Sequence, residues 1–413
     1  MQSKSKSKIV VQKYGGSSIG NVEKIKNVAQ RIISYARGGN KIVVVVSAMG
    51  DTTDELVALA RKINPNPSER EMDMLMSTGE QISCSLLAMA LHKRGVDAIS
   101  FTGSQIGIIT DTDHTQAKIL KIETDRIKKE LNKGKIVIIA GFQGLSTAFE
   151  ITTLGRGGSD LSAVALAVSI GADLCEIYTD VGGIYTADPR LVAEAKKLKY
   201  ITFDEILELA ARGAQVMHTR AVEVAKKFNI PLHVRGSFTK EEGTMIMEKI
   251  PFIEEPVIRG ATLAANEAKI TLCNVQDKPG IAARVFTELA KQNINVDMIV
   301  QNVSHKRTTD ISFTAPKRNL IKTLKISRRI VKGIGAGEVL FDENIAKVSV
   351  VGVGMKSHSG VAAKCFSILA KNKINIDMIS TSEISISCIV KKDAGKKALK
   401  VLHKEFKLDK IKS

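Results

Sequence analysis

The stretch Lys41-Ile-Val-Val-Val-Val-Ser47 decides which class of fold this sequence predicts. Four consecutive valines after an isoleucine offer no polar side chain to solvent, so we expect a strand that is buried on both faces, as in a parallel sheet. Similar short apolar runs lie on both sides of it and alternate with longer helical patterns as far as residue 235. This alternation predicts an α/β fold, with a mainly parallel sheet sandwiched by helices.

The individual elements follow from the same periodicities. Thr202 and Glu205 have the spacing of a capping box, which predicts a helix start, and two prolines within residues 248–256 indicate a linker. We expect strands over Lys8–Lys13, Lys41–Ser47, Asp97–Phe101, Lys135–Ala140, Leu174–Thr179 and Pro231–Arg235, and helices over Val22–Arg37, Asp54–Ile63, Glu69–Arg94, Gln116–Asn132, Ser159–Ile170 and Phe203–Phe228.

The C-terminal third contains an internal repeat. Residues 277–299 match residues 357–379 without a gap, and more than half of the aligned positions are identical, including Gly280 with Gly360 and a shared Asp-Met-Ile ending. Each copy reads as strand, glycine turn, amphipathic helix and strand, which predicts two related βαβ modules. The chain therefore divides into an α/β domain at 8–247, a linker at 248–259, and modules at 260–343 and 344–413.

Composition narrows the classes of function. The chain has 413 residues and a formal net charge of +18, but its lysines are spread thinly, aromatic residues make up 4% and tryptophan is absent, so we expect no nucleic-acid partner. No apolar stretch reaches about 18 residues, so we expect no membrane span. Five well-separated cysteines and the lack of an apolar signal segment favour reduced thiols and a cytoplasmic location. The sequence contains neither an HExxH motif nor a Cys/His cluster, so it predicts no zinc site.

Four glycine-containing loops follow predicted strands. The richest is Thr152-Thr-Leu-Gly-Arg-Gly-Gly-Ser-Asp160, which opens a helix, so its free N–H groups favour an anion and Arg156 adds a guanidinium fork. The others are Lys13-Tyr-Gly-Gly-Ser-Ser18, Ser47-Ala-Met-Gly-Asp-Thr-Thr53 and Thr179-Asp-Val-Gly-Gly-Ile-Tyr-Thr-Ala-Asp-Pro-Arg190. Any one of them could be a plain turn, but ligands bind beyond the carboxyl ends of parallel strands, so together they predict a phosphate site.

These loops, together with Ser77-Thr-Gly-Glu80 and Tyr185-Thr-Ala-Asp-Pro-Arg190, resemble the aspartokinases. That family places a domain of the amino-acid kinase fold before two ferredoxin-like ACT modules, as this chain does. The resemblance implies transfer of the ATP γ-phosphoryl group to the β-carboxylate of L-aspartate, giving 4-phospho-L-aspartate for lysine, threonine and methionine (diaminopimelate) biosynthesis. It also implies Mg²⁺, held mainly by ATP phosphates and water rather than by a protein ligand.

The resemblance also implies residue roles. Lys13, Arg156 and Asp160 are expected to be catalytic: Lys13 at the γ-phosphoryl group, Arg156 on a substrate carboxylate, and Asp160 orienting Lys13 or the loop. ATP contacts are expected from Lys13, Tyr14, Gly15, Gly16, Thr179, Asp180, Tyr185 and Arg190, and aspartate contacts from Ser47, Thr53, Glu80, Arg156 and Ser159. Two motifs depart from the family pattern: Gly213-Ala-Gln-Val216 lacks a lysine common in relatives, and His358-Ser-Gly360 replaces His-Pro-Gly.

The two modules imply regulation by an amino acid. A glycine turn that faces a helix start suits a carboxylate, and the resemblance implies lysine and/or threonine as effectors, a homodimer or larger assembly, and a regulatory subunit started separately at Met245 or Met247. Effector contacts are expected from Asp277, Ala282, Asn295, Asp297, Gln301, Val361, Asn375, Asp377 and Thr381. An amino-acid sensor with an inactive kinase domain is the alternative, which the intact Lys13, Glu80, Arg156 and Asp160 argue against.

Overall fold

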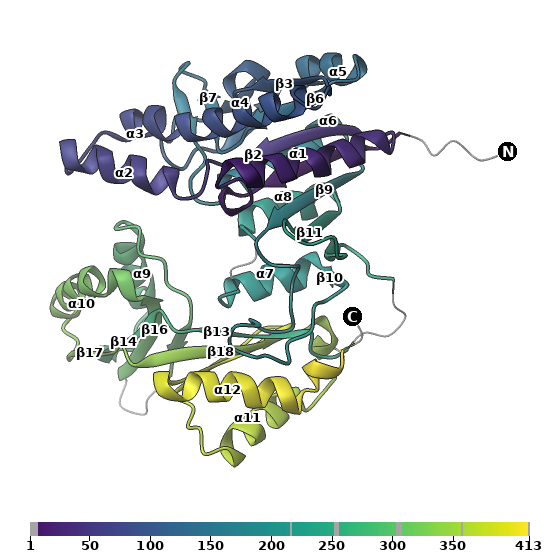
Figure 1. Cartoon of the computed structure of the whole chain (residues 1–413). Helices are drawn as coiled ribbons and strands as arrows, with labels where there is room; N and C mark the ends of the chain where they lie inside the picture. The colour runs from purple at the N-terminus through teal and green to yellow at the C-terminus, as the bar shows by residue number, and fades with distance from the viewer. Residues whose placement is uncertain (1–6, 215–216, 252–255, 303–307, 357, 412–413) are drawn as a thin grey trace.

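The computed structural model describes residues 7–214, 217–251, 256–302, 308–356 and 358–411 (Figure 1). Eight strands form the large sheet of the N-terminal domain, and every neighbouring pair is parallel except β11 with β12. In sheet order the strands are β10 (Tyr200–Thr202), β12 (Thr244–Met247), β11 (Leu232–Gly236), β9 (Leu174–Thr179), β1 (Ile9–Tyr14), β2 (Lys41–Val46), β6 (Ile136–Ala140) and β3 (Ala98–Phe101). The expected mainly parallel sheet is confirmed.

Helices cover both faces of this sheet, which explains the unbroken apolar run of β2. Val43 and Val45 pack in one core with the helices α5 (Asp125–Asn132), α6 (Gly158–Ile170) and α8 (Thr219–Phe228). Ile42, Val44 and Val46 pack in the other core with α1 (Val22–Arg37) and α4 (Thr78–His92). Alternate side chains of Ile42 to Val46 therefore enter opposite cores, and all five are buried.

A second, smaller sheet of the N-terminal domain lies beyond the carboxyl edge of the large one. Its strands, in order, are β5 (Ile119–Ile122), β4 (Ile108–Thr110), β7 (Gln143–Ser146) and β8 (Ile151–Thr153). The helix α3 (Glu69–Met76) packs against β8 and against α2 (Thr52–Ile63). Short 3₁₀ turns η1 (Gly16–Ser18) and η2 (Ser104–Ile106) and the helix α7 (Phe203–Ala211) complete the domain.

Two four-stranded antiparallel sheets form the C-terminal part. Each has helices on one side, and in Figure 1 they lie below the N-terminal domain. The first contains β15 (Ile299–Gln301), β16 (Thr308–Pro316), β14 (Glu267–Gln276) and β17 (Val339–Asp342), with α9 (Ile281–Ala290), η3 (Lys317–Asn319) and α10 (Leu320–Ile334). The second contains β19 (Met378–Thr381), β20 (Ser385–Lys391), β18 (Ile345–Val351) and β13 (Gly260–Ala264), with η4 (Val353–Lys356), α11 (Val361–Lys371), α12 (Lys392–Glu405) and η5 (Leu408–Lys410).

Strand β13 differs from the expected division of the chain. It precedes the first module in sequence, and residues 260–343 were expected to form that module. Instead β13 pairs antiparallel with β18, with Gly260 opposite Val351 and Ala264 opposite Lys347. It occupies in the second sheet the edge position that β17 occupies in the first. The second module is thus completed by a strand from the other side of the first.

Three expected helices are wrong in the structure because tertiary contacts interrupt them. The segment 69–94 breaks at Ser77, whose carbonyl accepts a hydrogen bond from Gln143 Nε2 (2.8 Å), and the neighbouring Gly79 packs so closely that a Cβ there would lie 2.8 Å from Ala48. The segment 116–132 begins with β5, a strand rich in β-branched residues that pairs with β4, and becomes helical only as α5. The segment 203–228 is helical as α7 as far as Ala211 and again as α8 from Thr219, and Gly213 between them has φ +111°.

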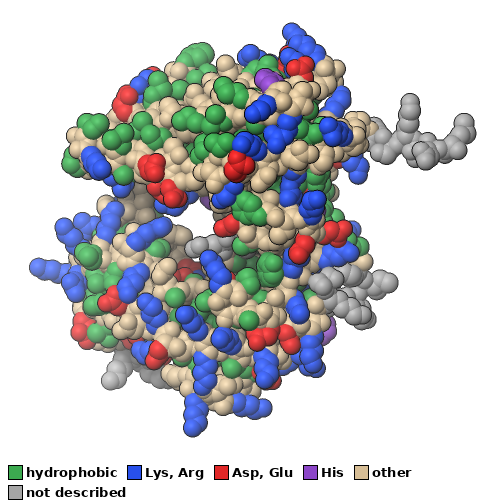
Figure 2. All heavy atoms as spheres, viewed as in Figure 1, with side chains coloured by type: hydrophobic (Ala, Val, Ile, Leu, Met, Phe, Trp, Pro, Cys, Tyr) green, Lys and Arg blue, Asp and Glu red, His purple; other side chains and the backbone are tan. Residues whose placement is uncertain are grey.

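Other expected elements are confirmed. The helix Val22–Arg37 has the expected bounds, and Thr202 with Glu205 forms the reciprocal capping box at the start of α7. Strands β4, β5, β7, β8, β10 and β12 were not expected; each of them has only three or four residues. Lys and Arg side chains are scattered over both lobes rather than gathered in one stripe on the face that Figure 2 shows. Among the described residues, none of the helices combines the length and hydropathy that a membrane span requires.

Candidate active site

The carboxyl ends of β1 and β2 and the start of α6 meet at one edge of the large sheet. There the Lys13 ammonium lies 2.6 Å from the Asp160 carboxylate, and both side chains are 13% exposed. The turn after Lys13 lies against the turn after β2, because a Cβ on Gly16 would come within 2.8 Å of the Ala48 carbonyl and 2.9 Å of the Gly50 carbonyl. Only glycine allows this approach. The expected orienting of Lys13 by Asp160 is consistent with this ion pair.

A cavity of ≈ 470 Å³ opens at this edge. Of the residues expected to bind ATP or aspartate, it unites Lys13, Gly15, Gly16, Ser47, Thr53, Glu80, Arg156 and Ser159. They come from β1 and the turn after it, the turn after β2, α2, α4, and the loop before α6 with its first turn, so residues far apart in the sequence share one wall. Five other lining residues belong to the predicted glycine loops: Ala48, Gly50, Gly155, Gly157 and Gly158. The rest were not expected: Asp54, Val57, Met76, Thr115 and Phe142.

Glu80 is the most perturbed group in this cavity. Its side chain is 3% exposed; Oε1 accepts a hydrogen bond from the Ala48 N–H (3.0 Å), and Oε2 has no hydrogen-bond partner. Desolvation raises its pKa to about 7, against which hydrogen bonds from the backbone of Glu80 and Ala48 act only in part. A buried carboxylate with a free oxygen in a cavity is suited to a cation.

The loop that carries Arg156 has a constrained backbone. Gly155 and Gly157 adopt φ values of +78° and +69°, which side chains disfavour, and a Cβ on Gly157 would lie 2.4 Å from His218. Gly158, Ser159 and Asp160 then begin α6. The N–H groups of Gly158 and Asp160 donate to the Gly155 and Gly157 carbonyls at 2.9 and 3.0 Å, so the helix start offers the cavity edge mainly the positive end of its dipole. Arg156 itself is exposed and lines the cavity. This combination suits an anionic ligand.

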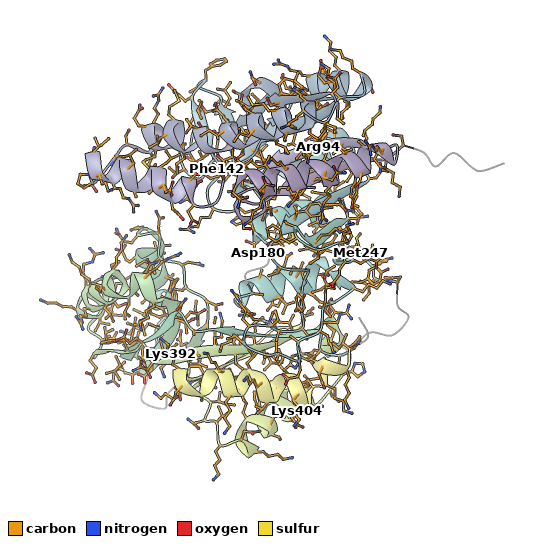
Figure 3. All side chains as sticks on the ribbon, viewed as in Figure 1. Arg94, Phe142, Asp180, Met247, Lys392 and Lys404 are labelled. Atoms are coloured by element: carbon orange, nitrogen blue, oxygen red, sulfur yellow. The ribbon has the colours of Figure 1, made fainter. Side chains whose placement is uncertain are left out.

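The remaining expected ATP residues lie outside this cavity, and apart from Tyr14 only Thr179 and Asp180 lie at the carboxyl end of a strand of the large sheet. Thr179 ends β9 next to β1, and the Gly15 N–H donates to the Tyr178 carbonyl (3.3 Å). Figure 3 shows Asp180 at the level between the N-terminal helices and the ACT modules. Tyr185 is half-buried. Arg190 is exposed, and its guanidinium is held by Asp188 (2.8 Å).

Tyr14 does not offer its side chain to a nucleotide. It is fully buried, stacks on Tyr178 with ring centroids 4.6 Å apart, and donates its hydroxyl hydrogen bond to Gln12. Because successive side chains of a strand point to opposite faces, Tyr14 enters the α1 core while Lys13 points the other way. The expected ATP contact of Tyr14 would therefore have to come from its backbone.

The expected effector residues divide between the two modules. In the second module, Val361 and Thr381 line a cavity of ≈ 510 Å³ together with Gly360 and Glu383. Asn375 and Asp377 do not line it; they lie at the other end of β19, where the Asn375 amide is 3.4 Å from Asp377.

In the first module, Asp277, Asn295 and Gln301 are exposed and Ala282 is half-buried. Gln215 and Val216, where the family lysine is missing, and Ser357 lie outside the described residues.

Asp297 is engaged by two cations in this structure. Its carboxylate pairs with Lys347 of β18, which is 1% exposed and also contacts Glu267 (2.8 Å), and with Arg212 at the end of α7 (3.4 Å). Asp297 thereby joins the first ACT module to the second and to the N-terminal domain. Its expected contact with an effector ammonium would require an exchange of these partners.

Comparison with known proteins agrees with this geometry. Residues 8–236 match the amino acid kinase family, and residues 269–330 and 348–406 match the ACT domain. The chain is 48% identical to the aspartate kinase of Stutzerimonas stutzeri over 402 residues, which cover 97% of this chain and 98% of that protein. It is 49% identical to the aspartokinase of Corynebacterium glutamicum over 406 residues, covering 97% and 96%.

A solved structure has the same arrangement. Escherichia coli aspartokinase III, in complex with aspartate and ADP in its R-state, is similar with a TM-score of 0.81 at 27% sequence identity, covering 96% of this chain and 99% of that one. The same enzyme with lysine and aspartate in its T-state gives a TM-score of 0.77. A kinase domain followed by two ACT modules, with near-complete coverage in both directions, leads to one conclusion: this chain belongs to the aspartokinase family.

Proposed function

We propose that this chain transfers the γ-phosphoryl group of ATP to the β-carboxylate of L-aspartate in the cavity at the ends of β1 and β2, giving 4-phospho-L-aspartate. The observation that carries the proposal is the composition of that cavity. It combines two cations, Lys13 and Arg156, with glycine N–H groups and one buried carboxylate, Glu80. The phosphates of ATP and the carboxylates of aspartate would pair with the two cations, and the α-ammonium group of aspartate would pair with Glu80.

The reaction needs charge neutralisation rather than a base. The β-carboxylate of aspartate is already ionised at neutral pH, so it attacks the γ-phosphorus without giving up a proton. The difficulty is to hold two anions in line, which the protein meets by positioning and by opposing charge. Lys13, held by Asp160 at 2.6 Å, is placed to stabilise the charge that develops on the transferring phosphoryl oxygens.

Aspartate is recognised by opposite charges at opposite ends. Arg156 presents a guanidinium fork for a carboxylate, and Glu80 presents its unpartnered Oε2 to the α-ammonium. Ser47, Thr53 and Ser159 add hydroxyl groups along the same cavity. ATP lies towards Thr179, Asp180 and the turn that follows. Mg²⁺ would supply charge neutralisation on the phosphates, with phosphate oxygens and water as its expected ligands.

The test separates the two substrates. ADP release is followed with varied aspartate and varied MgATP. Arg156→Lys should raise the KM for aspartate about 10- to 100-fold with little change for MgATP, because a point charge cannot reproduce a bidentate fork. Lys13→Ala should abolish turnover in a folded protein. Arg94→Lys, an exposed arginine outside the cavity, is the matched control.

Two results would overturn this assignment. Equal damage to both substrates in Arg156→Lys would move Arg156 to the phosphates. Wild-type protein that releases no ADP with aspartate would favour the alternative, an amino-acid sensor with an inactive kinase domain.

The ACT modules are proposed to give feedback inhibition. Aspartokinase III of E. coli has been crystallised with lysine in its T-state, and here the second module has a cavity at Gly360 and Thr381 where an amino acid would place its carboxylate near the helix start. Lysine, threonine, or both are the proposed effectors, and the enzyme would serve lysine, threonine and methionine biosynthesis.

Assembly is proposed to follow from the same modules, which pair side by side in a homodimer or larger complex. A separately started regulatory subunit remains a prediction. Met245 and Met247 lie inside β12, so such a product would begin within a strand of the large sheet.

A further inference from the structure

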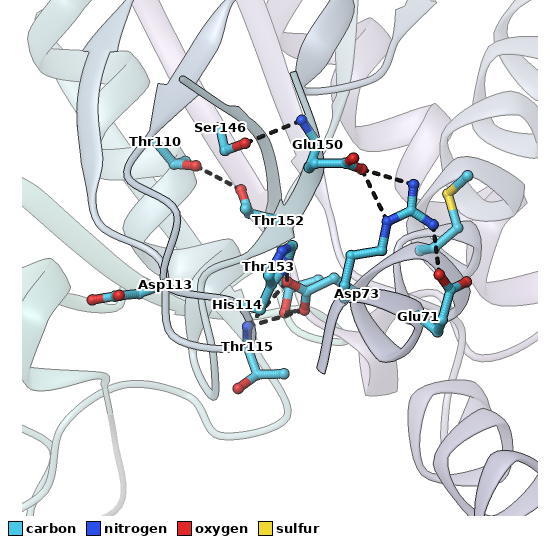
Figure 4. Close-up of polar contacts among 12 residues, drawn as sticks. Glu71, Asp73, Thr110, Asp113, His114, Thr115, Ser146, Glu150, Thr152 and Thr153 are labelled. Atoms are coloured by element: carbon cyan, nitrogen blue, oxygen red, sulfur yellow. Dashed lines mark hydrogen bonds and ion pairs between the residues drawn. The ribbon is translucent and has the colours of Figure 1, made fainter. Parts of the chain in front are cut away.

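One carboxylate outside the cavity is buried completely. Asp73 lies on α3 and is 0% exposed. Figure 4 shows three groups converging on it. His114 Nδ1 donates to it at 2.8 Å, the Thr115 N–H at 3.0 and 3.1 Å, and the Thr153 hydroxyl at 2.5 Å. A carboxylate this deep is tolerated only because it is fully hydrogen-bonded.

The donors belong to two separate segments of the chain, of which one, β8, also packs against α3. His114 and Thr115 come from the loop between β4 and β5, and Thr153 is the last residue of β8. Thr115 has φ +64°, which a β-branched residue rarely adopts, so its conformation depends on the groups that hold it. Asp73 thus fixes a strained loop and a strand end at one point.

Both segments lead directly to the Arg156 loop. Thr115 lines the cavity, and its carbonyl oxygen lies 3.0 Å from the position that a Cβ on Gly155 would take. Thr153 lies three residues before Arg156, and its carbonyl accepts from the Ala117 N–H (3.0 Å). On the far side, Arg220 donates to the carbonyls of Leu154 (2.8 Å) and Ala117 (3.0 Å). The backbone before Arg156 is therefore clamped from both sides, with Asp73 on one of them.

We propose that Asp73 is a positioning residue for aspartate binding: with His114 it sets the height and direction of the Arg156 loop at the cavity. It touches no reacting atom and acts through Thr115 and Thr153. The inference rests on the proposed role of Arg156 as the aspartate ligand. It adds a specific mechanism, namely that the affinity for aspartate depends on a carboxylate that the substrate never contacts.

Kinetics distinguish this role from simple support of the fold. Asp73→Asn keeps the shape but leaves one oxygen for three donors, so the loop should shift. A shift of about 1 Å costs on the order of 10²-fold when a positioning group is involved, so we expect the KM for aspartate to rise about 10- to 100-fold and the KM for MgATP to stay within about twofold. A residue that only stabilises the fold would lower the melting temperature and the active fraction, and leave both KM values unchanged.

Paired variants sharpen the test. Thr153→Val removes one donor and Thr153→Ser keeps it; His114→Leu removes a donor and His114→Asn retains an N–H near the same place. Each removing variant should raise the KM for aspartate and each retaining variant should restore it. Glu71→Gln, on the same helix but exposed and paired with Arg70, is the control that should change neither KM.

The outcomes separate the two proposals. If Arg156→Lys leaves the KM for aspartate unchanged, the proposed role of Arg156 fails and this inference fails with it. If Arg156→Lys raises that KM while Asp73→Asn and Thr153→Val do not, only the positioning role is overturned. Should Asp73→Asn not fold, the Thr153 pair decides alone. In the double variant Asp73→Asn/Arg156→Lys, the two effects on KM should be less than additive, because the same contact is already lost.

Discussion

Glu80 should make aspartate binding depend on pH near neutrality. Its pKa is raised to about 7 because the carboxyl group is desolvated, and only the ionised form can pair with the α-ammonium of aspartate. With a pKa of about 7, roughly nine-tenths of the sites are ionised at pH 8 and roughly one-tenth at pH 6. The KM for aspartate at saturating MgATP should therefore rise roughly tenfold between pH 8 and pH 6. The substrate's own carboxyl and ammonium groups do not titrate in this range.

The assay is initial-rate ADP release against aspartate at half-unit steps from pH 6 to pH 8.5, with the coupling enzymes in excess at each pH. Glu80→Gln should have a high KM that hardly changes with pH, because the titrating group is gone. Glu71→Gln should reproduce the wild-type profile. A wild-type KM that stays level between pH 6 and pH 8 would refute either the raised pKa or the pairing of Glu80 with the ammonium.

The same group should lower the stability of the free protein above neutrality. A folded-state pKa raised from 4.5 to about 7 favours folding at low pH, and this contribution is lost as pH rises through about 7. A shift of this size corresponds to about 3 kcal/mol. Glu80→Gln should thus raise the free energy of unfolding in urea at pH 8 by up to about 3 kcal/mol, reduced by any loss at the buried amide, and the gain should shrink toward pH 5.

Two further predictions concern ion pairs away from the cavity. Burial by itself raises the pKa of Glu176, but hydrogen bonds from His233, Tyr35 and Gln12 and the charge of Arg235 hold that pKa at about 2. Glu176→Gln should therefore lower the free energy of unfolding at pH 7 by about 3 kcal/mol. The difference between the variant and the wild type should disappear as pH falls from about 4.5 toward 2. Asp297→Asn and Arg212→Gln each remove the ion pair between the first ACT module and α7, so both should raise the effector concentration for half-inhibition by about 5- to 150-fold without lowering uninhibited turnover. An effect of Asp297→Asn alone would assign the role to the pair with Lys347 or to a contact with the effector, and not to the pair with Arg212.

The sequence patterns correctly predicted the strands, helices and caps that depend only on local periodicity. The valines of β2, the helix Val22–Arg37 and the capping box at Thr202 all lie where the pattern indicated. The alternation of strand side chains also held the signal that Tyr14 must point away from Lys13. Interruptions of helices were harder to predict, because the break between α3 and α4 at Ser77 depends on Gln143, which lies on the distant strand β7.

Pairings between distant segments could not be predicted for a similar reason. Nothing near Asp297 in the sequence indicates that Lys347 will neutralise it, and nothing near Thr115 indicates that Asp73 will hold it. Cavity-lining residues that lie in glycine or hydroxyl motifs could be predicted as a group. Phe142 and Met76, which line the same cavity, have no such motif.

The pairing of β13 with β18 makes the first ACT module an insertion within the second. The chain leaves the second sheet after Ala264 and returns to it at Ile345, on two adjacent antiparallel strands. Both ends of the inserted module are therefore held next to each other by the hydrogen bonds between β13 and β18. Because β13 follows the catalytic domain along the chain and pairs with β18, the strand that follows the inserted module, a displacement of that module would act directly on the strand that joins both modules to the catalytic domain.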